Sequence, residues 1–439
     1  MNQYPKHFPW LRSVLFSGAI ATTAALSLFA PINDRSVFAA LQDSPKNVVD
    51  EAWQIVNREY VDGTFNQQDW QATRQQLLSK NYTSKEQAYE AIRAALKPLN
   101  DPYTRFLDPE QFQALTNQTS GELSGVGIRL AIDDKTKMLK VVEPIENSPA
   151  SKADIKAGDG ILAIDGKATK GMSIEDASAL IRGEVGTSVT LKLSREGKGV
   201  FDTKLTRAQI ELPSVHSSLK QEGNLQVGYI RLDEFSSHAA EQMKRAIKNL
   251  EAQKADAFVL DLRGNPGGLL QASVEIARMW LDTGKVVRTT DRQGSNEEFA
   301  ANRTALTKLP LAVLVDGNSA SASEILSGAL QDNRRATVIG SQTFGKALVQ
   351  SVHSLSDGSG IAVTIAHYYT PNGTDISHKG ITPDIKLDLT SDQEKRLAAE
   401  PNLRASNNDP QYKRAIAALE SGVFARPMQG QPTKPLSVR

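Results

Sequence analysis

The chain has 439 residues, and its 51 Lys and Arg against 50 Asp and Glu leave a formal charge of +1. A chain of this length is expected to form about two to four domains. The balanced charge gives no electrostatic basis for binding nucleic acid, and the absence of cysteine excludes a thiol nucleophile, a thiolate metal site and any disulfide.

The N-terminus has the layout of a secretory signal. Lys6 and Arg12 precede an apolar run from Val14 to Ala30, and a short polar stretch leads to the tripeptide Val37 to Ala39. A basic start, an apolar centre and small residues before a cleavage point are typical of such signals. We expect residues 1–39 to be removed on export, which leaves no integral membrane segment. A retained anchor is the alternative, because the run is close to the shortest length that spans a bilayer.

Residues 40–120 are predicted to be a helical N-terminal region. Apolar side chains recur at helical spacing between Asn47 and Tyr60, and further helical patterns fill roughly Gln68–Ser79 and Lys85–Leu96.

Residues 121–208 change to short β-like runs separated by glycine turns. The runs are Gly125–Ile128, Val141–Glu143, Ile161–Ile164 and Val189–Leu193, with one helix-like patch at Ile174–Arg182. This pattern predicts a small, β-rich α/β module.

Residues 209–395 alternate between strand-like and helix-like segments. The strand-like segments are Val227–Leu232, Ala257–Leu262, Leu311–Val315 and Thr337–Ile339, and the helix-like segments lie near residues 240–250, Leu269–Trp280 and Ala320–Leu330. Such alternation predicts a layered α/β core. Residues 396–439 are expected to be a tail that is helical to Leu419 and flexible beyond it.

Three glycine- or serine-rich segments follow strands of this core. Asn318–Glu324 holds three serines at a strand-to-helix junction, where a serine can be either a helix cap or a nucleophile. Asp261–Gly268 has glycines that either make a tight turn or present backbone N–H groups as an oxyanion hole. Gly340–Ala347 matches a phosphate-binding P-loop except at its last position, where Ala347 has no hydroxyl for magnesium.

Other hydrolase patterns are absent from the sequence. There is no Gly-x-Ser-x-Gly and no His-Glu-x-x-His, and the six histidines show no metal-binding spacing. No metal or cofactor is therefore expected. A serine nucleophile without an evident histidine leaves lysine as the candidate base.

These segments carry a resemblance to a known family. Gly125–Ile128, with Ile155–Gly166, resembles a protease PDZ domain, and Asp261–Gly268, Ser319–Ile325 and Thr343–Gln350 resemble the three signature segments of the carboxyl-terminal processing peptidases. Asp154 and Gly264 depart mildly from the family pattern, and affect only local loop shape.

The resemblance implies the site residues. It makes Ser321 the nucleophile and Lys346 the general base, and it makes Gln350 the residue that orients the lysine. The backbone N–H groups of Gly267 and Ala322 would form the oxyanion hole. The resemblance also assigns the binding of substrate C-termini to Gly125, Val126, Gly127 and Ile128. We expect burial to lower the pKa of Lys346, and Ser319 and Ser323 to act as helix caps.

The resulting hypothesis is an exported serine endopeptidase that selects protein or peptide substrates by their C-terminal tails. The sequence is most similar to the cyanobacterial and chloroplast branch of the family, which implies the photosystem II reaction-centre precursor as substrate and the thylakoid lumen or periplasm as location. A general cell-envelope protease, a catalytically inactive PDZ scaffold and a P-loop NTPase are the alternatives. As in relatives, residues 47–96 are expected to form a homodimer contact or a lid through an exposed apolar face.

Overall fold

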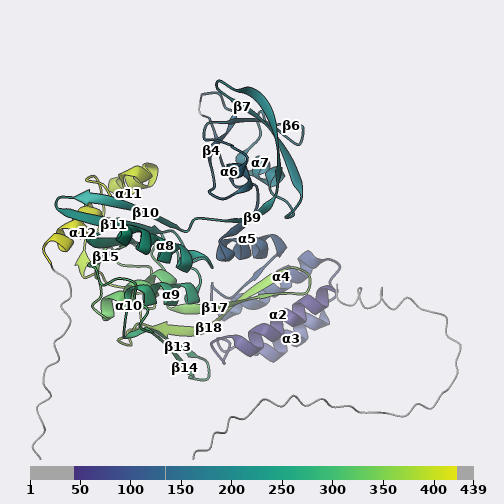
Figure 1. Cartoon of the computed structure of the whole chain (residues 1–439). Helices are drawn as coiled ribbons and strands as arrows, with labels where there is room; N and C mark the ends of the chain where they lie inside the picture. The colour runs from purple at the N-terminus through teal and green to yellow at the C-terminus, as the bar shows by residue number, and fades with distance from the viewer. Residues whose placement is uncertain (1–43, 134, 423–439) are drawn as a thin grey trace, which may run out of the picture. The chain divides into compact units, whose positions relative to one another are not determined.

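The computed structural model describes residues 44–133 and 135–422 (Figure 1). The expected signal peptide lies outside these residues. The first elements are α2 (Pro45–Glu59), α3 (Trp70–Ser79), α4 (Lys85–Leu96), η1 (Lys97–Leu99), β1 (Arg105–Leu107) and α5 (Pro109–Ser120). The carboxylate of Asp69 caps α3 and the hydroxyl of Ser84 caps α4, which fixes where these helices begin. The predicted helices of this region are confirmed, and α5 is an addition.

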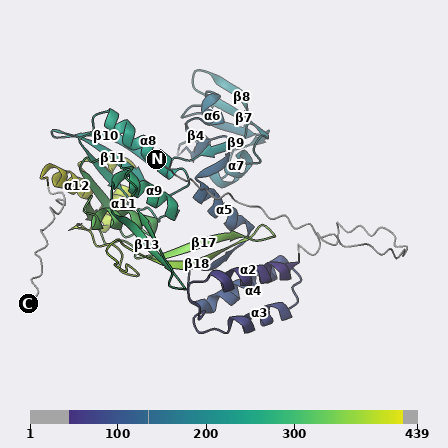
Figure 2. The ribbon, with the colours of Figure 1, turned by 60° about the horizontal axis from the view of Figure 1, so that its bottom comes forward.

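The apolar faces of α2 and α4 are buried inside the same chain. Val56 and Ile92 belong to a cluster that also contains Phe106 of β1 and Val363 of β18 (Gly360–Tyr369). Figures 1 and 2 show α2 beside β18. No large hydrophobic side chain between Pro45 and Leu99 is exposed. The exposed apolar face that we expected to support a dimer contact is therefore wrong, because the sheet of the same chain covers it.

The predicted PDZ module has its own sheet and its own core. Its strands are β2 (Glu122–Gly125), β3 (Ile128–Ile132), β4 (Leu139–Pro144), β5 (Gly160–Ile164), β6 (Lys167–Ala168), β7 (Ser188–Arg195), β8 (Gly199–Thr206) and β9 (Ala208–Glu211), and its helices are α6 (Pro149–Lys152) and α7 (Ile174–Ile181). The main sheet has the order β3-β4-β5-β7-β8, and β2 pairs with β9. Asp154 adopts a φ of 58° and accepts a hydrogen bond from Arg195, which explains why an aspartate fits this turn.

The third part is built on a six-stranded sheet. Its strands are β10 (Val215–Glu222), β11 (Leu225–Leu232), β12 (Ala257–Asp261), β15 (Leu311–Val315), β16 (Thr337–Gly340) and β19 (Ile385–Lys386), in the order β10-β11-β12-β15-β16-β19. All neighbours from β11 to β19 are parallel, and β10 is antiparallel. The predicted layered α/β core is confirmed.

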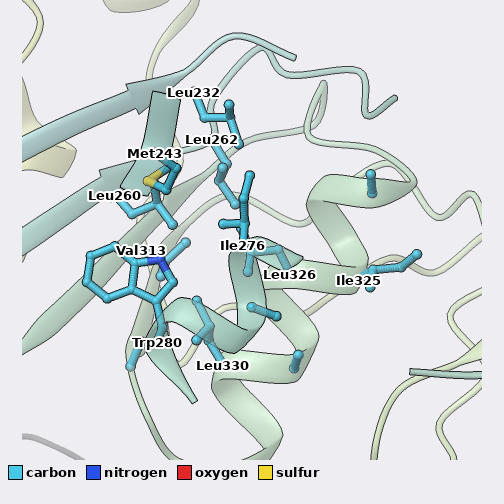
Figure 3. Close-up of a cluster of buried hydrophobic side chains, with 14 of the residues drawn as sticks. Leu232, Met243, Leu260, Leu262, Ile276, Trp280, Val313, Ile325, Leu326 and Leu330 are labelled. Carbon is cyan, nitrogen blue, oxygen red and sulfur yellow. The ribbon is translucent and has the colours of Figure 1, made fainter. Parts of the chain in front are cut away.

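Helices cover both faces of this sheet, as the strand residues show. Leu260 and Val313 pack with α8 (Ala239–Ala252), α9 (Leu270–Trp280) and α10 (Ala322–Asp332), the cluster drawn in Figure 3. Val259 and Leu314, which point the other way, pack with Tyr412 of α12 (Pro410–Glu420). Before α12 come α11 (Ser391–Ala399) and η2 (Pro401–Leu403). Thus α12 is a layer of the core, whereas the sequence placed it in the tail.

A buried ion pair ties α12 to a loop of the sheet. Arg263, whose side chain is 4% exposed, bonds Asp261 at 2.6 Å and Asp409 at 2.7 Å. Asp409 also caps α12 by accepting a hydrogen bond from Tyr412 N.

A second sheet was not predicted. Besides β1 and β18 it contains β13 (Lys285–Asp291), β14 (Asn296–Ala300) and β17 (Leu348–Ser354). The strand order is β1-β18-β13-β14, and β17 also pairs with β18, so the sheet joins segments that are far apart in the sequence. No helix among the described residues is long and apolar enough to cross a bilayer.

Candidate active site

Three loops meet at one edge of the core sheet. Residues 261–268 include the end of β12, residues 318–324 follow β15 and residues 341–346 follow β16. These strands are adjacent and parallel, so their carboxyl ends lie at the same edge. Together with α5 and β17, the loops line a cavity of about 400 Å³. The five residues that the resemblance assigns to catalysis all line it: Ser321, Lys346, Gln350, Gly267 and Ala322.

Ser321 stands directly before α10 in a strained conformation. Its φ of 54° and ψ of −113° are rare for a residue with a side chain and cost about 1–3 kcal/mol. The surroundings enforce this geometry, because the Ser321 N–H donates to the carboxylate of Glu324 at 2.8 Å. Ser321 occupies the N-cap position of α10 and also lines the cavity. The helix-cap position and the position expected of a nucleophile are therefore the same residue.

The two flanking serines do not cap the helix. Ser319 Oγ donates to the carbonyl of Leu262 at 2.8 Å, and Ser323 Oγ donates to the carbonyl of Asn265 at 3.0 Å. Both serines are fully buried. The predicted caps are wrong, because these hydroxyls join the serine loop to the neighbouring glycine loop.

The backbone N–H groups near Ser321 differ in availability. A Cβ at Gly267 would lie 2.8 Å from the carbonyl of Ala320 and 2.9 Å from Ser321 Cβ, so only glycine allows this approach. The Gly267 N–H, however, donates to Asn265 Oδ1 at 2.9 Å. Among the described residues, the N–H groups of Gly268 and Ala322 have no hydrogen-bond partner. Gly267 is therefore close to the nucleophile, but its own donor is engaged.

Lys346 is largely removed from water. Burial lowers its pKa, and the charge of Arg105 lowers it further, while Asp101 and Glu324 act in the opposite direction. The direction of the shift agrees with the expectation for a lysine base. The Lys346 Nζ atom lies 4.5 Å from the ring centroid of Tyr103.

Two buried side chains that the sequence reading did not assign hold the backbone of both loops. Glu324 accepts hydrogen bonds from the N–H groups of Ser321, Gly345 and Lys346. Burial raises the pKa of Glu324, and the hydrogen bonds that it accepts oppose that rise. Tyr368 Oη bonds the carbonyls of Ser321, at 3.1 Å, and Lys346. The third position of a helix often carries a capping Glu, which was a signal for Glu324, whereas Tyr368 lies on a strand that was not predicted.

Gln350 lies on β17, but its contact differs from the expected one. Its side-chain amide donates to Thr364 Oγ1 at 3.4 Å. Within the described residues no hydrogen bond joins Gln350 to Lys346. Lys346, Leu348 and Gln350 all line the cavity, as expected of every second residue in an extended segment, but the amide of Gln350 bonds Thr364 and not the lysine.

The P-loop interpretation of residues 340–347 does not agree with the structure. The N–H groups of Gly345 and Lys346, which would cradle a phosphate, bind the carboxylate of Glu324 instead. Strand β17 follows, where a P-loop requires a helix.

The predicted tail-binding loop of the PDZ domain runs from Gly125 to Ile128. Gly127 has a φ of 76°, and a Cβ there would lie 2.2 Å from Ser148 Cβ. Val126 is buried, and among the described residues the N–H groups of Val126 and Gly127 have no partner. Ile128 begins β3, an edge strand that packs beside α7. Unpaired donors next to a free strand edge can receive a peptide terminus.

The cavity contains neither histidine nor a candidate metal cluster. None of the five histidines that the structure describes lines it. In the described part of the chain no group of three or more His, Asp or Glu residues could hold a metal ion.

A parallel sheet with serine, glycine and lysine loops at one edge, joined to a PDZ domain, defines a PDZ-containing hydrolase. The profile of peptidase family S41 matches residues 226–387, and that of the PDZ domain matches residues 140–195. A carboxyl-terminal-processing protease of Picosynechococcus sp. is 46% identical over 376 residues, which cover 85% of this chain and 90% of the relative. The chloroplastic C-terminal processing peptidase of Tetradesmus obliquus is 40% identical over 353 residues, covering 77% of this chain and 76% of the relative.

A solved structure agrees with these relatives. The photosystem II D1 C-terminal processing protease matches with a TM-score of 0.52 and 38% identity, over 84% of this chain and 99% of that protein. The chain belongs to peptidase family S41, as a carboxyl-terminal processing protease.

Proposed function

We propose that the protein is an exported serine endopeptidase in which Ser321 is the nucleophile and Lys346 the general base. The observation that carries this proposal is the shared cavity. Ser321 and Lys346 line it together, and burial lowers the pKa of the lysine. A lysine with a lowered pKa can be neutral and accept a proton.

The reaction follows from these positions. Neutral Lys346 Nζ takes the proton of Ser321 Oγ, and the serine oxygen attacks the carbonyl carbon of the scissile peptide bond. The Ala322 N–H and a donor of the glycine pair Gly267–Gly268, of which Gly268 is free, stabilise the oxyanion. The ammonium of Lys346 then protonates the leaving amine, and water hydrolyses the acyl-enzyme by the reverse proton path. Gln350 borders the cavity and contributes to its polar lining.

The PDZ domain is proposed to select the substrate by its C-terminus. The free N–H groups of Val126 and Gly127 would receive the terminal carboxylate, and the substrate would add a strand to the edge of β3 from Ile128 onward.

Substrate and location are proposed from the relatives. One relative is chloroplastic, and one solved structure is a photosystem II D1 processing protease. With the secretory signal expected at residues 1–39, they support a role in the thylakoid lumen or periplasm and the photosystem II reaction-centre precursor as substrate. General processing of cell-envelope proteins is the second candidate, because the same chemistry serves both.

Intact-mass analysis of a precursor protein incubated with the enzyme tests the proposal, because it reports cleavage and its position. We expect removal of a C-terminal segment by the wild type and none by Ser321→Ala or Lys346→Arg, since a guanidinium stays protonated. Lys395→Arg, on the exposed side of α11, is the matched control and should be fully active. Turnover by Lys346→Arg would contradict the assignment of the base.

A further inference from the structure

A second cavity of about 570 Å³ adjoins the catalytic cavity. Residues of α4, η1, β1 and α5 line it. Arg105, Leu115 and Gln118 line both cavities, so the two spaces are neighbours across these side chains. Ligand sites commonly measure about 300–1,000 Å³. The second cavity is therefore large enough for several residues of a peptide.

Positive charge exceeds negative charge around this cavity. The charged lining residues are Arg93, Lys97, Arg105 and Asp101. Both oxygens of Asp101 accept hydrogen bonds from its own turn, one from Tyr103 N at 2.9 Å and one from the Thr104 hydroxyl at 2.7 Å. The only carboxylate of the lining is thus already engaged.

Two of the three cations lack a partner. Arg93 pairs with Asp108 at 3.0 Å and lies over the ring of Phe106. Within the described residues, the side chains of Lys97 and Arg105 make no hydrogen bond and no ion pair. Both side chains are exposed and line the same cavity, and such a pair suits a carboxylate, which the guanidinium can bind through two hydrogen bonds.

The course of the chain indicates which part of a substrate reaches this cavity. Helix α5 lines both cavities and ends at Ser120, and the PDZ domain begins with β2 at Glu122. In the proposed function the PDZ domain holds the substrate's terminus, so the segment that follows the scissile bond runs between the catalytic cavity and the PDZ domain, which α5 joins in the chain. The catalytic cavity also has apolar lining residues, among them Leu270, Ile325 and Val349.

We propose that the second cavity binds a carboxylate of the segment that the enzyme cuts off, through Arg105 and Lys97. This inference rests on the proposed function and adds a substrate preference to it. The carboxylate is an acidic side chain of the leaving segment, because the proposed function places the terminal group in the PDZ domain.

Arg105 connects this preference to the catalytic base. Its charge lowers the pKa of Lys346, which also senses Asp101 and Glu324 and faces the ring of Tyr103. A carboxylate bound to Arg105 offsets that charge and raises the pKa of Lys346 in the complex. The acid limb of kcat then lies at higher pH for a substrate with the carboxylate than for one without it.

Cleavage kinetics of the full-length enzyme with matched peptides test the proposal. The peptides of the first set are amidated and carry either Glu or Gln at one position of the leaving segment, and this position is varied along the segment. The second set makes the same Glu-to-Gln comparison at positions before the scissile bond. A third set has no acidic side chain and compares the free acid with the amide.

For the wild type we expect a KM about two- to fivefold lower for Glu than for Gln at one or more positions of the leaving segment, because Arg105 and Lys97 are exposed and exposed ion pairs are weak. Arg105→Gln should abolish this ratio and make the acid limbs of kcat coincide. Arg414→Gln, on the exposed side of α12, is the control and should keep the ratio.

Three results would overturn the inference. They are a wild type without any preference for Glu over Gln, a preference confined to residues before the scissile bond, and a preference that survives in Arg105→Gln. A free-acid preference in the third set measures tail recognition by the PDZ domain, and Arg105→Gln should leave it unchanged. Cleavage of the neutral peptide measures the proposed function separately, since that function predicts turnover of the neutral peptide as well.

Discussion

Glu324 joins the two catalytic loops, and Glu324→Gln tests that role with little change in size. Oε2 accepts from the N–H groups of Ser321, at 2.8 Å, and Lys346, at 3.0 Å. Oε1 accepts from Gly345 N, at 2.7 Å, and the Thr343 hydroxyl, at 2.6 Å. An amide keeps one acceptor and replaces the other with a donor, so it cannot satisfy all four groups.

The structure sets the size of the effect. The less costly orientation puts the amide nitrogen at the Oε1 position, because the Thr343 hydroxyl can rotate and accept from it. Only the Gly345 N–H then faces a donor. A buried donor without an acceptor costs about 1–3 kcal/mol. Removing the buried charge offsets part of this loss, so we expect the free energy of unfolding to fall by about 1–2 kcal/mol.

The effect on activity should be larger than the effect on stability. Displacement of Gly345 moves the adjacent Lys346, and a shift of about 1 Å at a catalytic group lowers kcat by roughly 100-fold. Urea unfolding and peptide cleavage measure the two quantities, with Glu90→Gln on the exposed side of α4 as the control. A Glu324→Gln enzyme with wild-type kcat and an unchanged unfolding midpoint would refute this reasoning.

Three further predictions concern the base, the last helix and the PDZ domain. Because burial lowers the pKa of Lys346, the acid limb of kcat/KM should lie below pH 10.5. Asp101→Asn removes a charge that raises this pKa, so it should move the limb to lower pH. A limb that does not move would contradict the assignment of Lys346 as the base. Asp409→Ala breaks a buried ion pair and a helix cap, and should lower the free energy of unfolding by about 3–5 kcal/mol in urea titrations. Ser321→Ala enzyme should bind free-acid peptides more tightly than amidated ones in calorimetry at both low and high salt, and equal affinities would remove tail recognition by Gly127 and its neighbours.

The strongly periodic elements were predictable from the sequence. The segments at α4 and β15 agree residue for residue with the structure, because one has a helical apolar face and the other is an uninterrupted apolar run. The hairpin of β13 and β14 was missed because it is largely polar, and β1 because it has only three residues. The sheet that they form depends on pairing with β18, and no local pattern reports a partner that far away.

Within the site, the positions of Ser321 and Lys346 were predictable because each follows a buried strand. The roles of Ser319 and Ser323 were not, because capping is a local rule and their actual partners lie 57 and 58 residues away. The partner of Gln350 was not predictable either, because Thr364 lies on β18, 14 residues away, and that strand was not predicted.

The late position of α12 in the chain bears on when the enzyme becomes active. Asp409 supplies one of the two carboxylates around Arg263, at the start of the glycine loop, and α12 covers the apolar face formed by Val259 and Leu314. A growing chain that stops before residue 409 already contains every residue that we propose for catalysis, yet it has a half-paired buried cation and an uncovered sheet. We therefore expect a chain that is still being synthesised or translocated to be unable to cleave neighbouring proteins. Proteolysis should begin only after α12 has joined the folded core.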